Sequence, residues 1–176
     1  MGIEGKEHIT VSQKLYYNPN PNLSVLVYGS SFFMNTYDLI QDMTFSQARD
    51  WTAGTKVTYY VKDWFSVTGS LHADFYDRFK RHERIDKRQK DYESSIYQPR
   101  LTVTSNYFNG HSLILGMEHT SDELTSDRFS GNANHDLKTR ALKETEYFLQ
   151  DEWTINPRWM ISAGIRTNFS KCIWFP

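Results

Sequence analysis

The segment from Glu146 to Asn168 constrains the fold of this chain more than any other stretch. Apolar residues recur at odd positions before the dipeptide Asn156-Pro157, and they do so again after it. These residues are Tyr147, Leu149, Trp153, Ile155, Trp159, Ile161, Ala163 and Ile165. Successive side chains of a strand point to opposite faces, so a period of two on both sides of a short turn predicts a β-hairpin.

The same period of two recurs along most of the chain, and no segment shows a convincing helical period. Strands are predicted at residues 8–17, 23–36, 49–61, 64–79, 95–108, 111–120, 143–155 and 158–169. Apolar residues take odd numbers in each of them, most clearly between Phe65 and Phe75. The sequence therefore predicts an all-β fold with about eight antiparallel strands in a meander.

The predicted connections alternate between short and long. Tight turns are expected at Asn18–Asn22, Lys62–Asp63, Asn109–Gly110 and Asn156–Arg158, and long loops at 38–48, 80–93 and 121–141. The Asn-Gly pair suits a two-residue hairpin turn, because both residues tolerate positive φ. Transmembrane barrels have short turns on one side and long loops on the other, so the alternation favours such a barrel.

Strand length and aromatic placement favour the same architecture. A tilted strand needs about 9–11 residues to cross a bilayer, and the segments 49–61 and 64–79 are long enough. Aromatic rings beside barrel ends form girdles at the two membrane interfaces. The residues expected there are Tyr17, Tyr59, Phe65, Tyr107, Trp153 and Trp159 near short turns, and Trp51, Phe75, Phe79 and Tyr97 near long loops.

Composition excludes few classes of protein. The net charge of -1 gives no reason to expect a nucleic-acid partner. Mean hydropathy is -0.64, which suits a soluble β-domain but also a barrel whose strands expose only alternate residues to lipid. Cys172 is the single cysteine, so no internal disulfide forms, and the start MGIEGKEH does not read as a secretory signal.

Two short stretches carry a family resemblance. The hairpin with FLQDEW and AGIR, and the strand ending in LGMEH with Glu118, resemble the barrel of TonB-dependent outer-membrane receptors of the siderophore type. The family often places an aspartate after the arginine of AGIR, where this chain has Thr167. The resemblance is strongest over residues 95–168.

The resemblance implies a 22-stranded barrel around a plug domain. Such a receptor lies in the cell outer membrane, in contact with its lipid. It binds a scarce ligand, such as a ferric siderophore, cobalamin or an oligosaccharide, and imports it with energy from the TonB complex acting through the plug. Because the chain supplies about eight strands and no plug-like region, we expect residues 1–176 to be one partial domain, an incomplete slice of that barrel. The stretch 170–176 loses the alternation.

Two groups of candidate site residues follow. Guanidinium groups offer planar donors to anionic oxygens, so ligand binding is assigned to the extracellular loop residues Arg81, Arg84, Lys87 and Arg88. The alternative for this loop is mutual compensation with its own acidic residues. Residues at even numbers are expected to face the lumen or the plug, namely His72, Asp74, Glu118, Glu152 and Arg166. By the same parity Asp151 falls on the lipid side, near a turn.

Catalytic and metal-binding patterns are not recognisable. The six histidines are scattered without metal-ligand spacing, and no Ser-His-Asp set, paired carboxylates or Gly-rich phosphate loop is evident. We therefore expect no enzyme activity, no metal and no cofactor. Two rival interpretations stay open: a self-contained small outer-membrane barrel with a structural or adhesive role, and a soluble β-sandwich that binds sugars through its aromatic residues.

Overall fold

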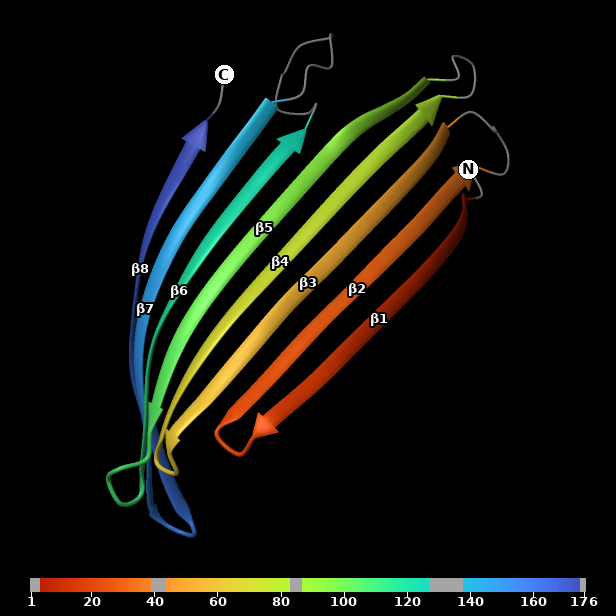
Figure 1. Cartoon of the computed structure of the whole chain (residues 1–176). Helices are drawn as coiled ribbons and strands as arrows, with labels where there is room; N and C mark the ends of the chain where they lie inside the picture. The colour runs from red at the N-terminus through yellow and green to blue at the C-terminus, as the bar shows by residue number, and fades with distance from the viewer. Residues whose placement is uncertain (1–3, 39–43, 83–86, 127–137, 175–176) are drawn as a thin grey trace.

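A computed structural model describes residues 4–38, 44–82, 87–126 and 138–174. These ranges form one sheet of eight antiparallel strands in sequence order, which confirms the all-β meander. Figure 1 shows a single curved layer whose free edges are β1 and β8. The strands are β1 (Glu4–Asn20), β2 (Leu23–Asp38), β3 (Thr44–Lys62), β4 (Phe65–His82), β5 (Lys87–Ser105), β6 (His111–Ser126), β7 (Lys138–Asn156) and β8 (Trp159–Trp174). Within the described ranges, no helix is long and apolar enough to cross a membrane.

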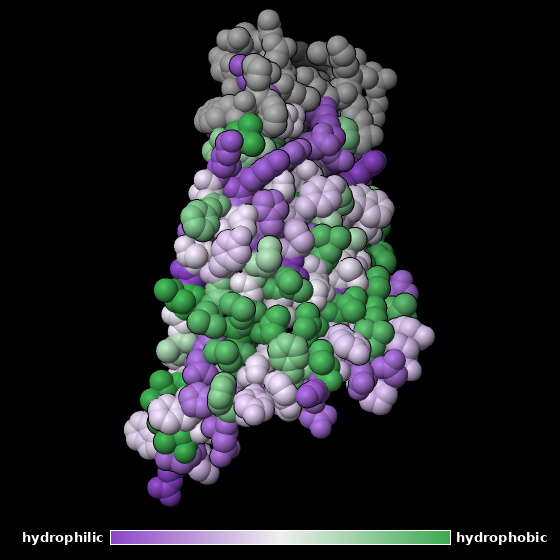
Figure 2. All heavy atoms as spheres, turned by 60° about the vertical axis from the view of Figure 1, so that its left-hand side comes forward, coloured by the Kyte–Doolittle hydropathy of each residue, from purple (hydrophilic) through white to green (hydrophobic). Residues whose placement is uncertain are grey.

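The pairing register explains why apolar residues share odd numbers throughout. Over most of the sheet, partners on neighbouring strands have the same parity, as in Val25 with Val57, Trp51 with Phe75 and Leu115 with Leu149. Odd-numbered side chains therefore lie on one face, called here the apolar face, and even-numbered ones on the other, the polar face. Figure 2 shows hydrophobic side chains gathered in a band across the sheet, with hydrophilic ones above it.

The described residues enclose almost no hydrophobic core. Only Ala48 and Ala141 are buried apolar residues among them, and no large side chain is fully buried. Central residues of the apolar face, such as Leu101 and Leu115, are 46% and 54% exposed. So large an exposed apolar surface is unusual for a protein in water.

Aromatic rings form two groups, one on the apolar face near the middle of the strands and one at their tight-turn end. Phe33 packs edge-on against Trp51 at 5.3 Å, Trp51 pairs with Phe75, and Phe75 packs against Tyr97 at 5.4 Å. We call Phe33, Trp51, Phe75 and Tyr97 the upper aromatic row. At the tight-turn end, Trp64 lies 4.9 Å from Tyr107 and His111 stacks on Trp153 at 5.3 Å.

On the polar face, two aromatic rings lie over glycines of the neighbouring strand. Tyr28 of β2 covers Gly54 of β3, where an added Cβ would meet the ring at 2.2 Å. Phe148 of β7 covers Gly116 of β6 in the same way, at 2.3 Å. A ring that fills the space left by a cross-strand glycine fixes the register between the strands.

Several predicted strand ends are wrong, because strands continue where loops were expected. Asp38 and the segments 44–48, 80–82, 87–93, 121–126 and 138–141 belong to strands. The apolar period stops there, yet the ladders extend with polar pairs such as Thr125 with Thr139, whose hydroxyls lie 2.8 Å apart. The remaining parts of the predicted loops lie outside the described residues.

The strand predicted at 95–108 ends early, at Ser105, before a turn. The amide of His111 donates to the carbonyl of Phe108 at 2.9 Å, and Gly110 has a φ of 78°. A positive φ is easy for glycine, so the tight turn at Asn109–Gly110 is confirmed.

We predict that Gly54→Ala destabilises the sheet by about 1–3 kcal/mol, because the new methyl group displaces the Tyr28 ring. Urea unfolding of the protein in detergent measures the change. Gly69→Ala is the matched control, since an added Cβ there meets nothing within 4 Å. Equal effects of the two substitutions would contradict a packing role for the Tyr28 ring.

Candidate functional site

A β-bulge in β5 creates the most deeply buried charge among the described residues. The register between β4 and β5 shifts after Arg78, so that Arg78 pairs with Tyr92 and Phe79 with Lys90, and Asp91 is the extra residue. Asp91 is only 2% exposed. The bulge turns its carboxylate toward the polar face, although its odd number would otherwise place it on the apolar face.

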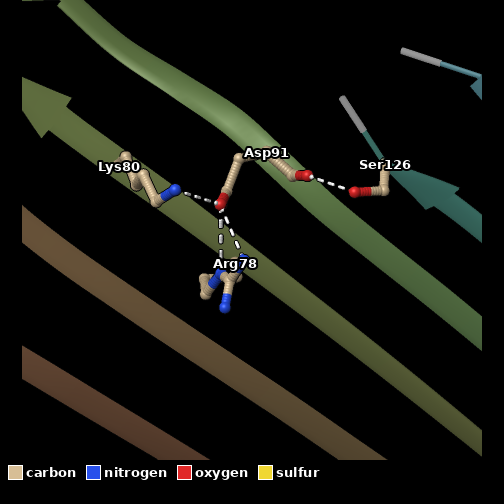
Figure 3. Close-up of polar contacts among 4 residues, drawn as sticks. All are labelled: Arg78, Lys80, Asp91 and Ser126. Carbon is tan, nitrogen blue, oxygen red and sulfur yellow. Dashed lines mark hydrogen bonds and ion pairs between the residues drawn. The ribbon is translucent and has the colours of Figure 1, made fainter. Parts of the chain in front are cut away.

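Two cations of β4 converge on this carboxylate, as Figure 3 shows. Arg78 donates from Nη2 to Oδ2 at 2.8 Å and from Nε to both oxygens at 3.2 Å. The Nζ of Lys80 lies 3.1 Å from Oδ2. The hydroxyl of Ser126, in β6, donates to the backbone carbonyl of Asp91 at 3.3 Å. Asp91 thus connects three strands beyond the upper aromatic row.

Electrostatics at Asp91 favour its ionised form. Burial by itself would raise the pKa of this carboxyl group, but hydrogen bonds and charge from Arg78 and Lys80 outweigh burial and lower the pKa. Lys90, at the same level, contacts Asp77 at 2.6 Å and Glu93 at 2.7 Å. Burial would lower the Lys90 pKa, yet the two carboxylates raise it. The described charges of this hairpin therefore compensate one another.

A second cluster crosses the polar face from β5 to β8. Glu118 and Glu146 are direct cross-strand partners, an unfavourable arrangement for like charges. Arg100 lies 3.6 Å from Glu118, and Arg166 lies 3.3 Å from Glu146. Both guanidinium groups also lie over the ring of Phe148, at 4.8 and 5.7 Å. The outer arginines offset the central carboxylates, so the cluster is close to neutral.

A shallow hollow of about 510 Å³ opens on the polar face between β3, β4 and β5. Its acidic residues are Asp50 and Asp74, whose carboxyl groups interact with each other. Its aromatic residues are Tyr76 and Tyr92, with ring centroids 5.5 Å apart. The remaining lining residues are Arg78, Ser94 and Ile96.

The five residues expected to face the lumen all lie on the polar face, but in separate places. Asp74 lies in the hollow, and Glu118 and Arg166 in the charged cluster. The Nδ1 of His72 lies 3.0 Å from the hydroxyl of Tyr28. Glu152 accepts a hydrogen bond from Gln150 at 3.0 Å.

The expected ligand-binding residues lie at the edge of what the structure describes. Arg84 lies outside the described residues. The backbones of Arg81 and Arg88 pair across β4 and β5, and Lys87 pairs with His82, but the side chains of these residues are not described. Their assignment to ligand binding stays a prediction.

Asp151 lies on the apolar face, as its parity indicates, and no bulge shifts the register there. Its Oδ2 lies 2.8 Å from Nδ1 of His111, whose ring stacks on Trp153. A polar partner from the neighbouring strand lowers the cost of placing a carboxylate among apolar side chains.

Sequence reasoning did not single out Arg78, Asp91, Arg100 or Glu146 as site residues. Even parity would have placed Arg100 and Glu146 on the polar face, where they meet the predicted Glu118 and Arg166. Asp91 gave no such signal, because its position depends on a bulge that breaks the parity rule.

Comparisons with protein-family models, curated proteins and solved structures find no match to this chain. Within the described ranges, no group of three or more His, Cys, Asp or Glu side chains is placed to hold a metal ion.

We predict that Asp91→Asn lowers the free energy of unfolding by about 1–3 kcal/mol at neutral pH, because Arg78 and Lys80 lose their anionic partner. The Asp91 pKa is lower in the folded state, so its contribution is complete above the unfolded pKa of about 3.9 and is lost as pH falls below it. The difference between wild type and variant, measured by urea unfolding, should therefore shrink below about pH 4. The matched control is Glu93→Gln, whose exposed carboxylate contributes little. A difference independent of pH would contradict the assignment.

Proposed function

We propose that this chain forms part of the wall of an outer-membrane β-barrel. The observation that carries the proposal is the apolar face, which spans all eight strands and is covered by no described residue. Lipid acyl chains supply the missing apolar environment, and the backbone ladders satisfy the polar groups of the strands between the two edges. A soluble β-sandwich would require a second sheet over this face, and the described residues form a single layer.

The spacing of the aromatic residues supports a membrane-spanning band. Along β3, Tyr59 follows Trp51 by eight residues, and along β4, Phe75 follows Phe65 by ten. At about 3.3 Å per residue these intervals measure roughly 26–33 Å along the strand. A tilt of about 35–45° reduces them to a height of roughly 19–27 Å, which agrees with the apolar band of about 25 Å on known barrels.

Charge placement agrees with this band. Asp77, Lys90 and Glu93 form an ion-pair group on the apolar face, beyond the upper aromatic row. Asp151 lies near the opposite end of the strands, beside His111 and Trp153. Charged side chains on a lipid-facing surface are least costly near the interfaces.

We further propose that the parent barrel is a TonB-dependent receptor in the cell outer membrane. The sequence resemblance of FLQDEW, AGIR and LGMEH supports this class, and the polar face then lines the lumen. The unpaired edges of β1 and β8 leave room for the further strands of a 22-stranded barrel. In the complete receptor, the barrel binds a scarce ligand such as a ferric siderophore, and the TonB complex drives import through the plug.

A self-contained small barrel is the second candidate. The specific observation in its favour is that β1 and β8 run in opposite directions, because an even number of strands alternates in a meander. They have the geometry to pair as antiparallel neighbours, and eight strands suffice for a small closed barrel.

Substitution of a lipid-facing residue tests the membrane proposal. We predict that Leu71→Arg, between Phe65 and Phe75 on the apolar face, reduces stability in phospholipid vesicles by about 2–4 kcal/mol. Thr68→Arg, in the same strand but on the polar face, is the matched control and should cost much less. The measurement is urea unfolding of vesicle-folded protein. The gel mobility of the protein before and after heating monitors this unfolding. Equal tolerance of the two substitutions would refute a lipid-facing role.

The gene that encodes the chain tests the receptor class. We expect the reading frame around this segment to encode a plug domain and additional alternating strands. A signal peptide directly upstream, and a stop codon directly downstream, would instead establish the small barrel.

A further inference from the structure

The described sheet ends at two free edges, the outer side of β1 and the outer side of β8. Along such an edge, alternate backbone amides and carbonyls point away from the sheet toward the place of a further strand. Lipid cannot satisfy these polar groups, so a membrane wall requires a strand beside each edge. The eight strands alternate in direction, so β1 of a second copy in the same orientation would run antiparallel to β8.

A glycine on the polar face of β8 indicates what the neighbouring strand should carry. Gly54 and Gly116, on the same face, are each covered by an aromatic ring from the directly paired residue of the adjacent strand. Gly164 differs, because the atoms nearest to an added Cβ there belong to Leu149 and Gln150, and none is part of a ring. Gly164 pairs with Gln150 on the β7 side, so a directly paired ring has to come from the open side of β8.

β1 carries an exposed aromatic residue on the same face. Tyr16 is 66% exposed, and its direct partner in β2 is Leu26 rather than a glycine. If β1 of a second copy places Tyr16 opposite Gly164, the ring covers this glycine in the same way as in the two pairs within the sheet. A ring over a cross-strand glycine fixes the register between two strands, so this contact selects one register for the new pair.

The same register brings together the polar residues that interrupt the apolar rows of the two edge strands. Residues 6–20 of β1 would lie opposite residues 160–174 of β8, which covers that strand almost completely. Gln13 and Thr167, both exposed and both flanked by apolar residues on the apolar face, then become direct partners. A hydrogen bond between them lowers the cost of placing two polar side chains in lipid. A shift of two residues would instead set Gln13 against Ile165.

One pair of like charges results from this register, and a described carboxylate offsets it. Lys14 would lie opposite Arg166, an unfavourable arrangement by itself. The guanidinium of Arg166, however, lies 3.3 Å from Glu146 and over the ring of Phe148, both in β7. The positive charge of Arg166 is therefore directed back into the sheet and away from the open edge.

We propose that the open edge of β8 pairs with β1 of a second copy of this chain, with Tyr16 over Gly164 and Gln13 beside Thr167. The occupant is a second copy because β1 and β8 of one chain lie on opposite sides of the curved layer in Figure 1. A second copy reaches β8 without further curling of the sheet. The inference rests on the membrane wall proposed above and concerns residues 1–176 alone, since further strands of a longer receptor would take the same edge.

Disulfide cross-linking in phospholipid vesicles tests the pairing and its register. Cys172→Ser removes the native cysteine, and one chain then carries Gln13→Cys while a second, mass-tagged chain carries Thr167→Cys. Directly opposed residues of paired strands have Cβ atoms about 4.5–5.5 Å apart, close to the separation that a disulfide bridges. We expect mild oxidation of the mixture to give a tagged–untagged heterodimer. Its yield should exceed that with Phe169→Cys in place of Thr167→Cys about fivefold, because diagonal neighbours are farther apart.

The contribution of the tyrosine ring is tested in the same mixture. Tyr16→Ala, added to the chain with Gln13→Cys, should lower the heterodimer yield about threefold, because Gly164 loses its cover. Tyr16→Phe keeps the ring and should preserve the yield. Tyr16 is exposed in the sheet, so neither substitution removes a buried contact. Equal yields from the alanine and phenylalanine variants would overturn the role of the ring.

The remaining outcomes separate the possible occupants of the edge. Absence of the heterodimer would overturn pairing with a second copy, and equal yields from the opposed and displaced cysteines would overturn the register. A cross-link within one chain that carries both Gln13→Cys and Thr167→Cys, without a heterodimer, would assign the edge to the chain's own β1. The membrane wall is judged separately by Leu71→Arg against Thr68→Arg, so a lipid-facing result without a heterodimer refutes the edge pairing alone.

Discussion

No described residue covers the apolar face of this single-layered sheet, and the rest of the structure depends on that condition. Only two alanines among the described apolar residues are buried, so cohesion within the sheet comes from backbone ladders and cross-strand pairs. Such a sheet requires cover for its apolar side chains and full pairing of its backbone polar groups. A bilayer supplies the cover and favours fully paired backbones. The proposed membrane location follows from this physical need.

On the polar face, neighbouring side chains fill the packing gaps and offset the charges. Tyr28 and Phe148 fill the spaces over cross-strand glycines, and the facing carboxylates Glu118 and Glu146 each have an arginine beside them. Asp91 likewise forms ion pairs with Arg78 and Lys80. The pair Asp50 and Asp74 is the exception, since its two carboxyl groups interact with each other and neither forms an ion pair with a described cation.

Much of the fold could be predicted because the apolar period of two reports directly on which face a residue occupies. The hairpin around Asn156, the turn at Asn109–Gly110 and the polar-face position of Glu118 and Arg166 were all predictable in this way. The period disappears beyond the upper aromatic row, where both faces are polar, so strands such as the start of β5 were mistaken for loops. Asp91 was missed for a related reason, because a bulge reverses the relation between residue number and face.

The sequence by itself determined the strand alternation, the tight turns and the division into an apolar and a polar face, since each depends on neighbours a few residues apart. Only the tertiary structure decided which polar residues meet. The contact between Arg78 and Asp91, the pairing of Arg100 with Glu118 and the shared hollow of Asp50 and Tyr92 join residues on different strands. These contacts depend on register and on one bulge, and a shift of a single residue would separate the partners and place them on opposite faces.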